Sequence, residues 1–147
     1  MSPELEFYSH LDEVTGGDVK LLAKWSQLAL PDCLASPGPG SCDLPDLDVV
    51  EISIVTDETI AEVHGQFLDD PTPTDVITFH HGELLVSYDT AKSVAASLDH
   101  SPLEELFLYV VHGLLHLNGH LDKEKVDREE MHRLQNGIWL RICESSR

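Results

Sequence analysis

Positive charge is scarce in this chain: lysine and arginine together number 9 against 27 aspartates and glutamates, and the formal net charge is −18. Nonspecific affinity for nucleic acid comes largely from Lys and Arg side chains that neutralise phosphates, so this composition argues against nonspecific binding to nucleic acid. The basic residues between positions 123 and 133 are interleaved with acids, a pattern typical of a solvated helix face. A role on nucleic acid therefore needs a local basic patch or a partner that supplies one.

Long apolar runs and paired cysteines are also lacking. No run approaches the length of a membrane span, and the acidic N-terminus has neither the basic nor the apolar segment of a signal peptide. The cysteines, Cys33, Cys42 and Cys143, are odd in number and lack CxxC spacing, so we expect reduced thiols. These absences predict a cytoplasmic protein without membrane attachment. The length of the chain predicts a single domain over residues 1–147.

The pattern of apolar residues predicts an α+β fold, with a single mixed β-sheet of about four strands packed with helices. Asp18 is expected to be the N-cap of the first helix, and a Pro- and Gly-rich loop is expected from residue 31 to residue 45. A turn is expected at residues 69–73. The predicted strands are 5–8, 48–55, 74–79 and 83–88, and the predicted helices are 18–28, 56–67, 89–98, 102–119 and 124–143.

One short run carries the strongest chemical signal. His112 and His116 are four residues apart in an apolar helical stretch, so both imidazoles lie on one helix face and can reach a single ion. Gly119 can end the helix and turn the chain back, which brings Asp122 or His120 toward the same point. Three protein ligands with a fourth position open to water are typical of a catalytic zinc site.

A histidine pair at this spacing also occurs on ordinary helices, as surface residues or as core residues with hydrogen-bond partners. The third ligand has two candidates. His120 would share the face of His112 and His116 on an uninterrupted helix, but positions 112 and 120 would lie about 12 Å apart along the axis. A turn at Gly119 suits Asp122 better.

The run from His112 to Gly119, followed by Asp122, resembles the signature of the YbeY family of ribosomal-RNA maturation metalloproteins. A second segment, residues 67–79, resembles the strand motif of the same family, and Gly82-Glu83 resembles its Gly-Asp step. The resemblance covers roughly residues 49–141. This chain has Asp122 where the family typically has a third histidine, and a carboxylate is an acceptable zinc ligand.

The resemblance implies a zincin-like metal site at a helix end, with His112, His116 and Asp122 as ligands of one zinc ion per chain, although other divalent transition metals suit this set. It implies a metal-dependent, single-strand-selective endoribonuclease that acts in 16S rRNA 3′-end maturation and ribosome quality control. Its partners would be single-stranded rRNA and the ribosomal small subunit or associated factors.

One departure bears on activity. Leu68 stands where the family often has an arginine that is thought to help bind the phosphate, so weak or partner-dependent cleavage is expected. The alternative function is a metal-stabilised, ribosome-associated binding module that cuts nothing. A peptidase is disfavoured because Gly113 stands where the HExxH motif has its glutamate.

The sequence assigns no general base. Glu83 and Asp75 are the acidic residues of the matched strand region, and Asp75 is interpreted as a backbone hydrogen-bonding residue at a strand start, with Thr74 equally structural. His80 and His81 lie in a predicted turn and are expected to be exposed to solvent. The remaining histidines have no ligand-like spacing; they are His10, His64, His100 and His132.

Overall fold

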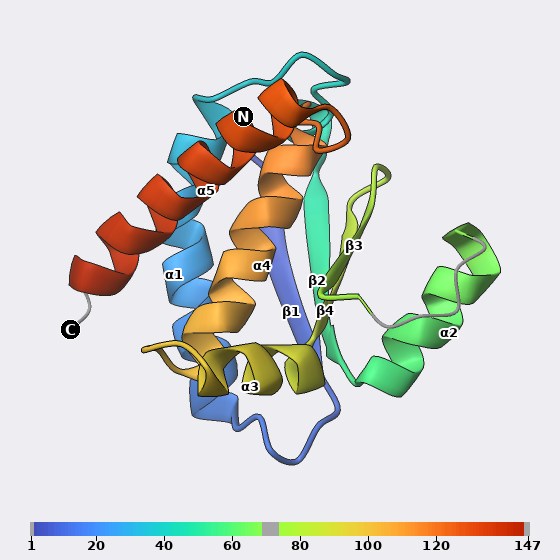
Figure 1. Ribbon diagram of the computed structural model, residues 1–147, viewed down its shortest axis with the longest axis vertical. Coiled ribbons are helices and arrows are strands. Elements are labelled where there is room, and N and C mark those ends of the chain that lie inside the picture. The colour runs from blue at the N-terminus through green and yellow to red at the C-terminus, as the bar shows by residue number, and fades with distance from the viewer. Residues whose placement is uncertain (1, 69–73, 146–147) are drawn as a thin grey trace.

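The computed structural model describes residues 2–68 and 74–145, and its centre is one mixed four-stranded sheet (Figure 1). The strands lie in the order β1-β2-β4-β3, with β1, β2 and β4 parallel and β3 antiparallel to β4. This arrangement confirms the predicted α+β class and places β3 at an edge of the sheet. The strand bounds are Glu4–Ser9 for β1, Val49–Val55 for β2, Val76–Phe79 for β3 and Glu83–Ser87 for β4.

Five α-helices surround this sheet in the described ranges. Helices α1 and α4 pack beside the sheet, α5 lies across both of them, and α2 stands on the other side (Figure 1). A short 3-10 turn at Leu44–Asp46 leads into β2. The helix bounds are Gly16–Leu34 for α1, Asp57–Leu68 for α2, Tyr88–Ala96 for α3, Pro102–Leu117 for α4 and Lys125–Ser145 for α5. None of the helices described is long and apolar enough to cross a membrane.

Alternation along the strands separates two apolar clusters. In β2, Val50, Ile52 and Ile54 are buried in the main core with α1 and α4, whereas the residues between them face the other way. In β4, Leu85 points away from that core and joins a smaller cluster with Ile60 of α2. Successive side chains of a strand point to opposite faces, so the sheet separates the helical core from the α2 side.

Helix α1 begins earlier and ends later than the sequence predicts. Thr15 is the N-cap, and Asp18 is instead the third helical residue, whose side chain accepts a bond from the Thr15 N–H in a reciprocal capping box. The helix also continues through Pro31 to Leu34, so the expected loop at residue 31 is wrong. A proline inside a helix loses one backbone bond. Here the full burial of Cys33 in the core offsets that loss.

Other element boundaries agree with the sequence to within about two residues. Thr56 accepts a hydrogen bond from the Thr59 N–H at the start of α2. Ser101 caps α4, with Pro102 at the first helical position. The turn expected at residues 69–73, and the side chain of Leu68, lie outside the described residues.

Candidate metal centre and its groove

The two histidines of the motif lie on the partly exposed side of α4. The opposite side of this helix is buried in the main core, as Val110, Val111 and Leu114 show. Ser101 and Glu104 form a capping box at its start. The helix ends at Leu117 and is followed by the C-cap residue Asn118 and by Gly119, which has φ +94°. A non-glycine residue is strained at that angle, so Gly119 allows the chain to reverse.

A loop that precedes β2 holds this reversal in place. The Gly38 N–H donates to the Asn118 carbonyl at 2.9 Å, and the Gly40 N–H donates to the Gly119 carbonyl at 2.7 Å. A Cβ atom added to Gly38 would lie 2.5 Å from the Gly119 carbonyl carbon, so only glycine allows this approach. The Asn118 side chain in turn donates to the Cys33 carbonyl at 2.9 Å at the end of α1.

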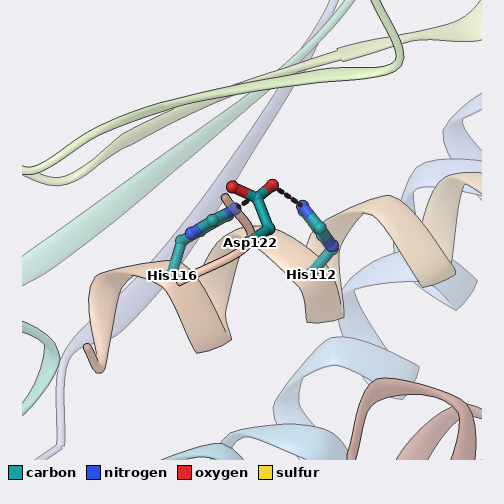
Figure 2. A group of neighbouring side chains, drawn as sticks. All are labelled: His112, His116 and Asp122. Atoms are coloured by element: carbon teal, nitrogen blue, oxygen red, sulfur yellow. Dashed lines mark ion pairs between the residues drawn. The ribbon is translucent and has the colours of Figure 1, made fainter. Parts of the chain in front are cut away.

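The reversal brings Asp122 over the two imidazoles, and Figure 2 shows its carboxylate between the rings of His112 and His116. Asp122 Oδ2 lies 3.3 Å from His116 Nε2 and 3.9 Å from His112 Nε2. One potential ligand atom from each of the three residues lies within 4.8 Å of the others. The structure therefore brings together the three residues that the sequence motif singles out.

Both rings are held through their other nitrogen. His112 Nδ1 lies 2.7 Å from Gln135 Oε1 on α5, and His116 Nδ1 lies 2.9 Å from the His120 carbonyl oxygen. These oxygens are acceptors, so each Nδ1 carries the proton and each Nε2 keeps a lone pair directed at the cluster. An acceptor behind the ring is the usual support of a metal-ligating histidine.

Burial also favours the neutral form of His112. The pKa of its imidazole is lowered mainly because burial penalises the charged ring, and further because His116 lies beside it. Metals bind the neutral imidazole, so this environment favours the ligating state.

His120, the rival third ligand, lies apart from this cluster. Its side chain is buried, with only 4% of the residue exposed, and its Nε2 lies 2.6 Å from the Ser36 carbonyl oxygen. The contribution of His120 to the cluster is its backbone carbonyl, which holds His116. The ring itself ties the chain reversal to the loop that precedes β2.

A groove of about 410 Å³ runs beside the cluster, between the edge strand β3 and the end of α4. Asp75 lines it, and its carboxylate accepts the Val76 N–H at 2.8 Å, as interpreted from the sequence. His80 also lines this groove. The groove is lined by residues 74–78 together with His80, His112, His116, Asp122 and Lys123.

Glu83 and His81 belong to a different cavity. They line an apolar pocket of about 600 Å³ between α2 and the other face of the sheet, which lies apart from the histidine cluster. Both turn histidines are exposed, as predicted, with 51% of the His80 side chain and 71% of the His81 side chain accessible. Glu83 is therefore poorly placed to act on a group bound at the cluster.

Two residues of the site, Gln135 and Asp43, are not predicted by the sequence. Gln135 lies 23 residues from His112 on another helix, and Asp43, whose Oδ2 lies 2.8 Å from His80 Nδ1, is in an irregular loop. Neither has a spacing that relates it to the histidine motif. Only the packing of α5 on α4, and of the loop on the end of α4, brings them near.

Comparison with known proteins agrees with the motif. Residues 40–142 match the family model described as Endoribonuclease YbeY. A protein named Endoribonuclease YbeY from Rhodopirellula baltica is 40% identical over 100 residues, which are 61% of this chain and 52% of that protein. One of the same name from Lactiplantibacillus plantarum is 30% identical over 158 residues, 92% of this chain and 94% of that protein.

The fold has a counterpart among solved structures. The solution structure of TM1509 from Thermotoga maritima matches with a TM-score of 0.63 and 22% identity, over 96% of this chain and 90% of that one. This likeness bears on the fold alone. The chain spans about half the length of the first curated relatives that it matches, at 52% and 54%.

Proposed function

The chain belongs to the YbeY family, and on this premise we propose that it is a metal-dependent endoribonuclease that cleaves single-stranded RNA. The relatives' name supplies the class of reaction. The observation that carries the proposal is the convergence of His112, His116 and Asp122 within 4.8 Å beside a groove.

The donor set fits a zinc ion. Two imidazole Nε2 atoms and one carboxylate oxygen are ligands that zinc accepts, and three protein ligands leave a coordination position open. The Nδ1 partners of both rings, Gln135 and the His120 carbonyl, leave the Nε2 lone pairs directed inward. We propose one zinc ion per chain at this zincin-like site, with other divalent transition metals as possible substitutes.

When bound, the ion would supply Lewis-acid polarisation of a phosphodiester oxygen and lower the pKa of water. The chain's own residues provide the rest. His112, His116 and Asp122 hold the ion, and Gln135 and the His120 carbonyl fix the two rings. The groove beside β3 positions the scissile phosphate, with Lys123 providing positive charge next to Asp122.

We further propose that the substrate is ribosomal RNA, in 16S rRNA 3′-end maturation and ribosome quality control in the cytoplasm, with the small subunit or its factors as partners. The acidic composition supports partner dependence. Lys123 is the single Lys or Arg among the described residues that line the groove, so the isolated chain offers little charge for a polyanion.

The same observation favours a second candidate, a metal-stabilised, ribosome-associated module without nuclease activity. The two functions differ in what the metal does. In the enzyme, loss of the ion abolishes cleavage, whereas in the module it lowers only stability and docking.

The test is elemental analysis of the purified protein and of His116→Ala, followed by incubation of both with a single-stranded rRNA fragment. Two remaining ligands rarely hold a first-row ion, so we expect one metal per chain and RNA cleavage in the wild type, and neither in the variant. His132→Ala is the matched control, because this exposed histidine has its ring 6.5 Å from that of His112 but lies outside the cluster.

Each outcome decides between the candidates. If the wild type holds metal but does not cleave the RNA, either free or presented on small subunits, the binding module is favoured. Stoichiometric metal in His116→Ala, or no metal in either protein, contradicts the site.

A further inference from the structure

His80 and His81, successive residues of the β3–β4 turn, line cavities on opposite sides of the sheet. His80 lines the groove that contains His112, His116 and Asp122. His81 lines the pocket on the α2 side, where its Nε2 lies 3.3 Å from Glu83 and its ring stacks on Phe79. The turn therefore presents one imidazole to the candidate metal centre and keeps its neighbour away from it.

Asp43 orients the histidine that faces the groove. His80 Nδ1 lies 2.8 Å from Asp43 Oδ2, and the Ser41 hydroxyl donates to the other carboxylate oxygen at 3.0 Å. The hydrogen bond from His80, followed by that from Ser41, holds the pKa of Asp43 below its usual range. Asp43 is therefore a carboxylate at neutral pH, so His80 Nδ1 is the donor and His80 Nε2 is left for another group.

Asp43 is itself fixed to the end of the helix that carries the cluster. Its backbone N–H donates to the Leu117 carbonyl at 2.8 Å, one residue beyond His116, and Cys42 forms a β-bridge with Asn118. The segment that orients His80 and the helix that carries the cluster therefore form one unit. Histidines that act as catalytic general bases are commonly held in this way, with a carboxylate that accepts from Nδ1–H.

We propose that His80 is the general base of the RNA cleavage proposed above, on which this inference rests, and that Asp43 is its positioning residue. His80 Nε2 takes the proton from the substrate's 2′-hydroxyl group as the bond between that oxygen and phosphorus forms, which gives a 2′,3′-cyclic phosphate. The bond between phosphorus and the leaving ribose oxygen breaks, and its electron pair stays on that oxygen. The imidazolium then returns the proton to the leaving oxygen, so one proton moves from the attacking to the leaving group.

The other groups of the groove are less suited to this task. Asp75 already accepts the Val76 N–H, and Asp122 is committed to the cluster. Lys123 is a cation. Among the residues that the structure describes, the charged or titratable groups that contact His80 or share its groove are Asp43, Asp75, His112, His116, Asp122 and Lys123.

The experiment compares His80→Gln with His81→Gln on a single-stranded rRNA fragment. Glutamine keeps a side chain that can donate to Asp43 but cannot take up a proton at neutral pH. We expect kcat to fall by about 10²-fold or more in His80→Gln, in the range of general-base effects, and to stay within about twofold of wild type in His81→Gln. Metal content, and affinity for a cleavage-resistant 2′-O-methyl oligonucleotide, should be unchanged in both.

Asp43→Asn tests positioning apart from structure. Removing the carboxylate charge destabilises the protonated imidazole, so the acid limb of the kcat–pH profile should move to lower pH while kcat falls. A purely structural role for Asp43 would lower activity without moving that limb. The unfolding midpoint and metal content of each variant show whether the fold and the ion are retained.

The two proposals fail in different ways. If the wild type cleaves RNA and loses activity in His116→Ala, but His80→Gln is as active as His81→Gln, the base assignment is overturned and the endoribonuclease stands. If His80→Gln loses metal or oligonucleotide affinity along with activity, His80 acts in binding and the assignment is again overturned. If the wild type cleaves no single-stranded RNA, alone or on small subunits, both proposals fall.

Discussion

The imidazole of His116 is fixed by the backbone of His120: Nδ1 of the ring lies 2.9 Å from that carbonyl oxygen, across the chain reversal at Gly119. This hydrogen bond links the candidate ligand His116 to the turn that places Asp122 beside it. Because the acceptor is a main-chain oxygen, a substitution of the His120 side chain leaves it in place. Ring orientation and third-ligand placement therefore depend on one local structure, the end of α4.

This relationship separates the roles of Asp122 and His120. We expect Asp122→Ala to weaken zinc binding by more than about 100-fold, beyond the 10–100-fold typical of losing a residue behind a ligand. His120→Ala keeps its carbonyl but loses the buried ring and its contact with Ser36, so it should lower the free energy of unfolding more than the zinc affinity. Zinc competition titrations and urea unfolding of both variants check this. The reverse ranking in the titration would assign the third ligand to His120.

Gln135 should tune the site without touching the ion. Gln135→Leu removes the oxygen 2.7 Å from His112 Nδ1, which frees the ring to rotate or change tautomer, so zinc affinity should fall by about 10–100-fold. Gln135→Glu keeps an acceptor and should retain most of the affinity. Asn136→Leu is the matched control, since this exposed amide on the same helix lines a different pocket. Equal affinities in the two leucine variants would rule out the supporting role.

The sequence predicts the parts of this site that depend on local patterns. Residue spacing predicts the helix that carries His112 and His116, and the structure confirms it as α4. Capping residues predict its start at Ser101-Pro102 and the turn at Gly119, and both are present. The predicted end of α1 was wrong, because burial of Cys33 in the core outweighs the tendency of Pro31 to end a helix. Gln135 and Asp43 could not be predicted, since their positions depend on the packing of distant segments against α4.

Three glutamates stand side by side on the sheet face away from the helical core. Glu51 of β2 pairs in register with Glu6 of β1 and with Glu83 of β4. These charges also affect Tyr8. The pKa of its phenol is raised by its hydrogen bond to Glu6 and by the nearby carboxylates of Glu6, Glu51 and Glu4. Like charges directly opposite each other destabilise a sheet.

Glu51→Gln should therefore raise the free energy of unfolding by about 0.2–1 kcal/mol, the range of a cross-strand pair. Added salt screens exposed charges, so the gain should shrink between low and high ionic strength. Urea unfolding measures both effects. Glu62→Gln removes one charge of the same sign from helix α2 and controls for net charge alone; an equal gain there would contradict the local effect.

The cysteines should differ sharply in reactivity. Cys33, Cys42 and Cys143 are thiols without a disulfide, and burial raises the pKa of Cys33 to about 12. The thiolate is the reactive form, so between pH 7 and 10 Cys33 remains protonated as well as inaccessible. Partly exposed Cys42 should be alkylated first by iodoacetamide at pH 8, and Cys33 only as the protein unfolds. Mass spectrometry of timed samples, with a urea-unfolded sample in which all three react, gives the order. Raising the pH from 8 to 10 should leave Cys33 unmodified while the protein stays folded; early modification of Cys33 would contradict its burial.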